Sequence, residues 1–110
     1  MKYDFDCVVI GAGFAGMTAA IYLKRANVNV LLIDKDAPGG ILNKINKIEN
    51  YPGYISISGP DLAFKMYEQI KNLGIEIRYG NVLKINDHII KTDLEEIIIF
   101  GKVVEYFGKV

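Results

Sequence analysis

The chain has 110 residues, a length typical of one domain, and 51% of them are hydrophobic, enough for a modest core. The 13 basic and 13 acidic side chains cancel, and this balance argues against a nucleic acid or an anionic membrane as a partner. The single cysteine, Cys7, excludes an internal disulfide or a cysteine-based zinc site, so we expect it to be a small buried hydrophobic residue.

The distribution of charged and apolar residues also disfavours a membrane or secreted protein. No apolar run approaches the roughly 20 residues that a helix needs to cross a bilayer. Lys2, Asp4 and Asp6 precede only a very short apolar run, which does not resemble a secretion signal. We therefore expect a cytoplasmic protein without a membrane partner.

A glycine-rich turn lies near the N-terminus, between a predicted strand over residues 6–10 and a predicted helix over 13–26. Its sequence, Gly-Ala-Gly-Phe-Ala-Gly, is the fingerprint of a dinucleotide-binding βαβ unit. Gly11 permits the turn, Gly13 leaves room for a diphosphate, and Gly16 lets the helix pack close to the strand. The start of the helix offers unpaired N–H groups and a partial positive charge to phosphates.

A second apolar strand, predicted over residues 29–33, ends at Asp34. The helix between the two strands favours a right-handed crossover and parallel pairing. Asp34 lies about 20 residues beyond the glycines, where a carboxylate can accept hydrogen bonds from an adenosine ribose. A carboxylate there disfavours the 2′-phosphate of NADP, although Lys35 is adjacent. The alternative is a glycine-containing turn that binds nothing.

A long loop follows over residues 35–59 and carries many apolar side chains, so we expect it to pack onto the core or onto a ligand. The next helix is predicted to begin near Pro60 and to end at Gly74. Its apolar side chains at helical spacing predict one buried stripe. They are Leu62, Met66, Ile70 and Leu73.

The last third of the chain is predicted to be β structure. A strand over residues 75–79 is followed by short strands over 82–85, 88–91, 96–100 and 103–107, with tight turns at 86–87 and 101–102. The predicted fold class is therefore α/β, a Rossmann-like core of parallel strands with a C-terminal antiparallel β-meander. If nothing covers residues 97–107, their hydrophobic edge predicts self-association.

Four segments in order resemble the N-terminal FAD-binding segment of low-molecular-weight thioredoxin reductases, in the pyridine nucleotide-disulfide oxidoreductase family. The resemblance covers residues 3–93. The segments are GAGFAGMTAAIYLKRAN, LLIDKDAPGGIL, KIENYPGY and SGPDLAFKMYEQIKNLGIEI. Family members usually have proline at the position of Phe14 and glutamine at that of Ile41, which leaves Ile41 a backbone or packing role.

The resemblance implies FAD as the cofactor and assigns residues to each part of it. The glycine turn would surround the diphosphate, Asp34 and Lys35 would lie at the adenosine ribose, and residues 39–42 would follow the ribityl chain and flavin. Asn50 would approach the isoalloxazine ring, and the backbone of Val82 would face the adenine. The implied cofactor-binding residues are Gly11, Ala12, Gly13, Phe14, Ala15, Asp34, Lys35, Gly39, Gly40, Ile41, Leu42, Asn50 and Val82.

In the full family, NADPH reduces the flavin, and the flavin reduces a Cys-x-x-Cys disulfide that serves thioredoxin. This sequence has one cysteine and one G-x-G-x-x-G motif, and no catalytic or metal-binding residue is predicted. We expect residues 1–110 to form an incomplete FAD-binding domain with an atypical tail over 94–110, unable alone to complete the reductase cycle. A second copy or a complementing chain is a further expected partner. The alternatives are a non-catalytic FAD- or NAD-binding module and an inert truncated remnant.

Overall fold

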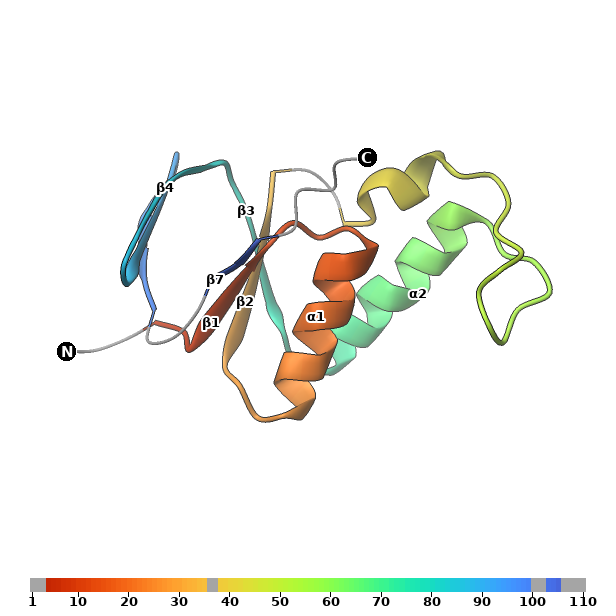
Figure 1. The fold of residues 1–110 in the computed structure, drawn as a ribbon, viewed down its shortest axis with the longest axis horizontal. Coiled ribbons are helices and arrows are strands. Elements are labelled where there is room, and N and C mark those ends of the chain that lie inside the picture. The colour runs from red at the N-terminus through yellow and green to blue at the C-terminus, as the bar shows by residue number, and fades with distance from the viewer. Residues whose placement is uncertain (1–3, 36–37, 100–102, 106–110) are drawn as a thin grey trace.

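The computed structural model describes residues 4–35, 38–99 and 103–105. Two helices cover one face of a parallel sheet, and a small antiparallel sheet covers the other (Figure 1). In chain order the elements are β1 (Cys7–Ile10), α1 (Phe14–Arg25), β2 (Val30–Asp34), the 3-10 helix η1 (Gly40–Lys44), α2 (Gly59–Asn72), β3 (Glu76–Tyr79), β4 (Val82–Asn86), β5 (Ile89–Thr92), β6 (Glu96–Ile98) and β7 (Val103–Glu105).

The parallel sheet has the order β3-β2-β1-β7, and each neighbouring pair is parallel. Its central strands are apolar because both of their faces are buried. Val9 and Leu32 point to the helical layer, whereas Val8 and Leu31 point to the antiparallel sheet. This alternation follows from the two-residue period of a strand. The predicted parallel βαβ core is confirmed.

The two helices pack through the residues that their sequences predict. On α1 the buried positions include the small residues Gly16 and Ala20, which allow a close approach to the sheet. On α2 the predicted stripe is buried at Leu62, Met66 and Ile70. Gly74 follows α2 with φ +77°, a left-handed conformation that ends a helix readily. Neither helix in the described part of the chain has the length and hydropathy that a membrane crossing requires.

The antiparallel sheet has the order β4-β5-β6. Three strands of the predicted meander are thus confirmed, with the first turn at residues 87–88 instead of 86–87. Ile90, Ile97 and Ile99 are buried against the parallel sheet. The condition for a hydrophobic edge is therefore not met at Ile97 and Ile99, because the chain's own core covers their side chains. Self-association stays a prediction.

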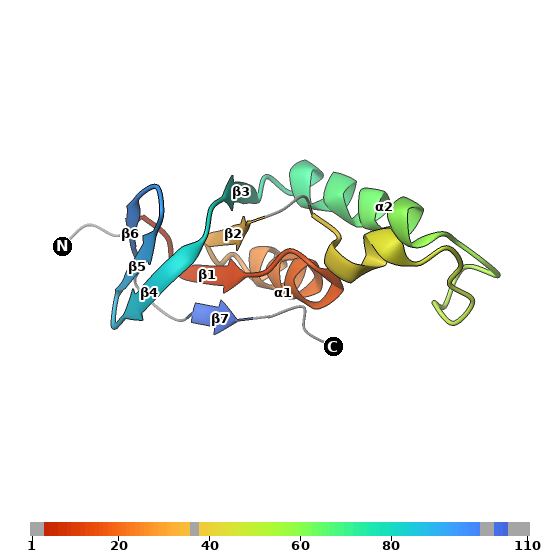
Figure 2. The same ribbon diagram turned by 90° about the horizontal axis from the view of Figure 1, so that it is seen from above.

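The prediction that residues 103–107 continue the meander is wrong for β7. This strand pairs in parallel with β1, in the register Val8↔Val103, and forms the edge of the main sheet (Figure 2). Short apolar strands carry no sequence mark of their partner, and the open edge of β1 offers unpaired backbone groups to any extended segment. The predicted turn at residues 101–102, like residues 106–107, lies outside the described residues.

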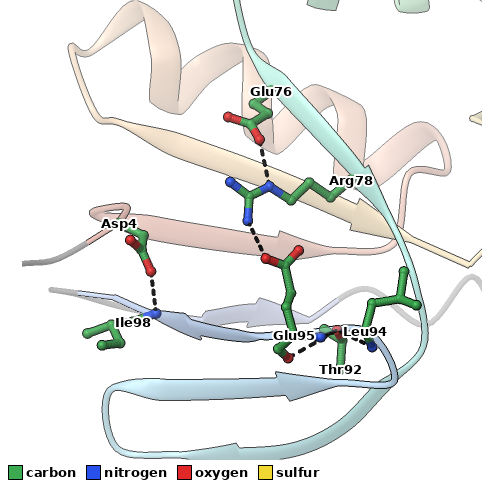
Figure 3. Close-up of polar contacts among 7 residues, drawn as sticks. All are labelled: Asp4, Glu76, Arg78, Thr92, Leu94, Glu95 and Ile98. Atoms are coloured by element: carbon green, nitrogen blue, oxygen red, sulfur yellow. Dashed lines mark hydrogen bonds and ion pairs between the residues drawn. The ribbon is translucent and has the colours of Figure 1, made fainter.

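Charged side chains attach the antiparallel sheet to the parallel one (Figure 3). Arg78 of β3 donates to Glu76 at 2.6 Å and, across the two sheets, to Glu95 at 2.9 Å. The Ile98 N–H donates to the Asp4 carboxylate at 3.0 Å. The Arg78–Glu95 pair thus holds the residue before β6 to β3, and the Asp4–Ile98 bond holds β6 to the N-terminal segment.

Candidate nucleotide-binding site

The glycine turn between β1 and α1 requires glycine at two positions. Gly11 has φ +106°, a conformation that side chains rarely adopt, and its N–H donates to the Ile33 carbonyl at 2.7 Å. A Cβ atom on Gly16 would overlap the Gly11 carbonyl oxygen. The turn therefore brings the start of α1 directly against the end of β1, as the motif predicts.

Gly13 leaves open space at the start of α1. It is the N-cap residue, no side chain in the described structure caps this end, and a Cβ built on it meets no atom within 4 Å. The first helical bond runs from the Met17 N–H to the Gly13 carbonyl at 3.0 Å. The N–H groups of residues 14–16 precede that bond, so they lack intrahelical acceptors and can donate to an anion.

Asp34 lies beside this turn, at the end of β2. Its Oδ2 atom accepts a hydrogen bond from the Ala12 N–H at 2.7 Å. Its backbone carbonyl accepts from the Gly80 N–H at 2.9 Å, just after β3. Burial, then the charges of Tyr67 and Asp34, raise the pKa of the Tyr79 phenol, which lies opposite Asp34 on β3. Asp34 thus ends β2 and bonds to the residues that follow β1 and β3.

The segment that leads into η1 lies against the glycine turn. Gly39 has φ +117°, and its N–H donates to the Ala12 carbonyl at 2.8 Å. A Cβ on Gly40 would lie 3.3 Å from the Gly13 Cα atom. The structure therefore brings together three sequence-predicted regions: residues 11–15, Asp34 and the Gly39–Gly40 pair.

An open pocket of about 400 Å³ continues from the turn toward the long loop. Apolar side chains form much of its wall, and polar side chains contributed by the loop lie among them. The lining residues are Phe14, Leu42, Ile45, Lys47, Ile48, Glu49, Asn50, Tyr51 and Leu62. Three predicted site residues, Phe14, Leu42 and Asn50, thus line one pocket.

Three other predicted site residues do not line this pocket. Lys35 and Ile41 are exposed. Val82 begins β4, pairs with Thr92 of β5 and packs against the core under the antiparallel sheet. Tyr51 lines the pocket but was not among the predicted site residues. The sequence feature that could have indicated this role is the position of Tyr51 among the apolar residues of a long loop.

The predicted packing of the long loop is confirmed in part. Leu42 and Ile57 are buried, and Ile48 packs on the core. Ile55, by contrast, is 95% exposed in the outer part of the loop. A Cβ on Gly59 would overlap the Leu42 carbonyl oxygen, so glycine permits the contact between η1 and the start of α2.

Comparison with known proteins defines the class. Residues 5–104 match the profile of the pyridine nucleotide-disulphide oxidoreductases, and the chain belongs to this family. It is 47% identical over 83 residues to the thioredoxin reductase of Bacillus subtilis (strain 168), covering 76% of this chain and 26% of that protein. With the thioredoxin reductase of Mycoplasma pneumoniae the identity is 42% over 105 residues, covering 93% of this chain and 33% of that one.

Solved structures agree with this classification. The thioredoxin reductase of Lactococcus lactis superposes with a TM-score of 0.86 at 44% identity, covering 92% of this chain and 35% of that one. A ferredoxin-flavin thioredoxin reductase from Clostridium acetobutylicum gives 0.79 at 30% identity, covering 94% of this chain and 37% of that one. The chain spans between about a quarter and a third of the curated relatives it matches.

Proposed function

We propose that this chain binds FAD across the carboxyl ends of β1 and β2, as the FAD-binding portion of a thioredoxin-disulfide reductase-like flavoprotein. The observation that carries the proposal is the open space at Gly13, beside an uncapped helix start and one carboxylate. Unpaired amides suit a diphosphate, and a carboxylate suits ribose hydroxyls. Family membership and the named relatives support a flavin.

Each segment of the site has a role in this proposal. The amides of residues 11–15 bind the diphosphate, and Asp34 accepts hydrogen bonds from the adenosine ribose, with Lys35 beside it. The backbone of residues 39–42 follows the ribityl chain, and Asn50 lies toward the isoalloxazine ring. The Val82 backbone faces the adenine. The residues bind and orient the cofactor, and the bound flavin supplies the electron-transfer chemistry.

The wider activity rests on the relatives, since this chain spans only part of their length. In a complete reductase, NADPH would supply electrons and thioredoxin would accept them. A binding module that holds FAD without redox turnover is the second candidate, because the sequence has one cysteine and so no Cys-x-x-Cys pair. Reduction of bound flavin by NADPH would distinguish the first role from the second.

Titration of the purified chain with FAD tests the proposal. We expect a flavin absorption spectrum and a gain in thermal stability with FAD concentration. Gly13→Ala should retain the fold, because its new methyl group enters open space and costs about 1 kcal/mol or less. The same methyl group should obstruct the diphosphate and weaken FAD binding about tenfold or more.

Gly16→Ala is the matched comparison for folding stability. Its methyl group would overlap the Gly11 carbonyl, so we expect a loss of roughly 3 kcal/mol of folding stability even without FAD. If the unmodified chain is colourless and gains no stability from FAD, the proposed function is wrong. If Gly13→Ala binds FAD as tightly as the unmodified chain, the diphosphate does not lie at this turn.

A further inference from the structure

We propose that Phe14 is a positioning residue, whose ring holds the loop of residues 45–58 against the start of α1 and so fixes one wall of the pocket. This inference rests on the proposed function for its consequence in FAD binding. The contact itself is a property of the chain without FAD.

Three aromatic rings connect the glycine turn to this loop. Phe14 is the first residue of α1, and its side chain remains 40% exposed. Its ring lies 6.0 Å from that of Tyr51, with an interplanar angle of 85°. The Tyr51 ring lies 6.1 Å from that of Tyr54. The first distance and angle define an edge-to-face pair, which is worth more than the apolar area that it buries.

The loop needs such a contact because its backbone is anchored mainly at its base. Ile48 and Ile57 exchange two hydrogen bonds, of 2.7 and 3.0 Å. Beyond this bridge the loop extends past the start of α2 (Figure 1). Within this outer part, the Tyr54 N–H donates a hydrogen bond to the Tyr51 carbonyl at 3.1 Å. Most residues of this outer part are exposed. Side-chain contacts therefore decide how the outer loop is held.

The Phe14–Tyr51 contact couples the loop to the nucleotide site. Both rings line the pocket, together with Asn50, which is adjacent to Tyr51 in sequence. The backbone of Phe14 belongs to the first turn of α1, where the free amides lie. A ring at position 14 thus links the proposed diphosphate end of the site to the proposed flavin end.

Amide hydrogen exchange of the FAD-free chain tests the inference. Phe14→Leu keeps an apolar side chain but removes the ring, so we expect exchange of residues 49–56 to be about two- to tenfold faster. Phe14→Tyr keeps the ring and should restore the original rates. The Tyr51 ring signals in the NMR spectrum should shift in Phe14→Leu and remain in place in Phe14→Tyr. Phe64→Leu removes an exposed ring on α2 and serves as the control.

Equal exchange rates in Phe14→Leu and the unmodified chain would overturn the inference. So would exchange in Phe14→Tyr that is as fast as in Phe14→Leu, or an acceleration in Phe64→Leu equal to that in Phe14→Leu. If Phe14→Leu does not fold, Tyr51→Leu removes the Phe14–Tyr51 contact from the loop side, together with the Tyr51–Tyr54 contact. It must then accelerate exchange of residues 49–56 by about twofold or more. FAD binding is measured in parallel. Absence of binding by the unmodified chain refutes the proposed function, whereas the exchange rates decide the role of Phe14 independently.

Discussion

At the scale of single residues, the Asp34 carboxylate has two roles. It accepts a hydrogen bond from the Ala12 N–H in the glycine turn, and it is the proposed acceptor for the ribose hydroxyls. Asp34→Asn keeps an oxygen for the Ala12 N–H but removes the negative charge. We expect the fold to remain and the FAD dissociation constant to rise about tenfold, since hydrogen bonds to charged groups contribute roughly 1.5–3 kcal/mol. Glu68→Gln, an exposed change on α2, is the control. Unchanged affinity in Asp34→Asn would exclude a ribose contact.

The Cys7 thiol makes the stability of the fold depend on pH. Burial, and then the neighbouring Asp6 charge, raise the pKa of this thiol above its ordinary value of 9.0. Between the unfolded and the folded pKa, the native chain keeps a proton that the unfolded chain has lost, so stability falls as pH rises through that window. We expect the free energy of unfolding to decrease above about pH 9. Urea titrations over this range should show a smaller decrease in Cys7→Ala.

At the scale of elements, α2 depends on a cap formed outside the helix. The Ser58 hydroxyl accepts a hydrogen bond from the Asp61 N–H at 3.1 Å, and Asp61 lies at the positive end of the helix. Ser58→Ala should lower the free energy of unfolding by about 1 kcal/mol, measured as a lower urea midpoint with an unchanged slope. Ser56→Ala, two residues earlier in exposed chain, is the comparison. Equal midpoints for the two variants would show that the cap contributes nothing.

Elements with a strong local pattern could be predicted from the sequence. Periodicity identified α2, and the glycine motif with Asp34 identified α1 and the turn before it. The pairing of β7 could not be predicted, because strand partners are chosen by tertiary contacts and not by local pattern. The contact of Phe14 with Tyr51 was equally inaccessible, since a loop conformation determines it.

At the scale of the whole molecule, the charges balance and the proposed diphosphate contacts are backbone amides. Binding should therefore release few counterions. We expect the FAD dissociation constant to change less than about threefold between roughly 0.05 and 0.5 M NaCl. Ala15→Lys, which adds a cation at the start of α1, should bind FAD more tightly at low salt and lose that gain at high salt. A steep salt dependence in the unmodified chain would indicate a basic side chain at the phosphates.

The parallel pairing of β1 with β7 has a consequence for biosynthesis. A ribosome makes β1 early and its outer neighbour only after most of the intervening chain has emerged. Until then β1 presents an open row of backbone donors and acceptors to any extended peptide nearby. Nascent chains that stall before β7 should consequently be the species that chaperones bind and that aggregate first.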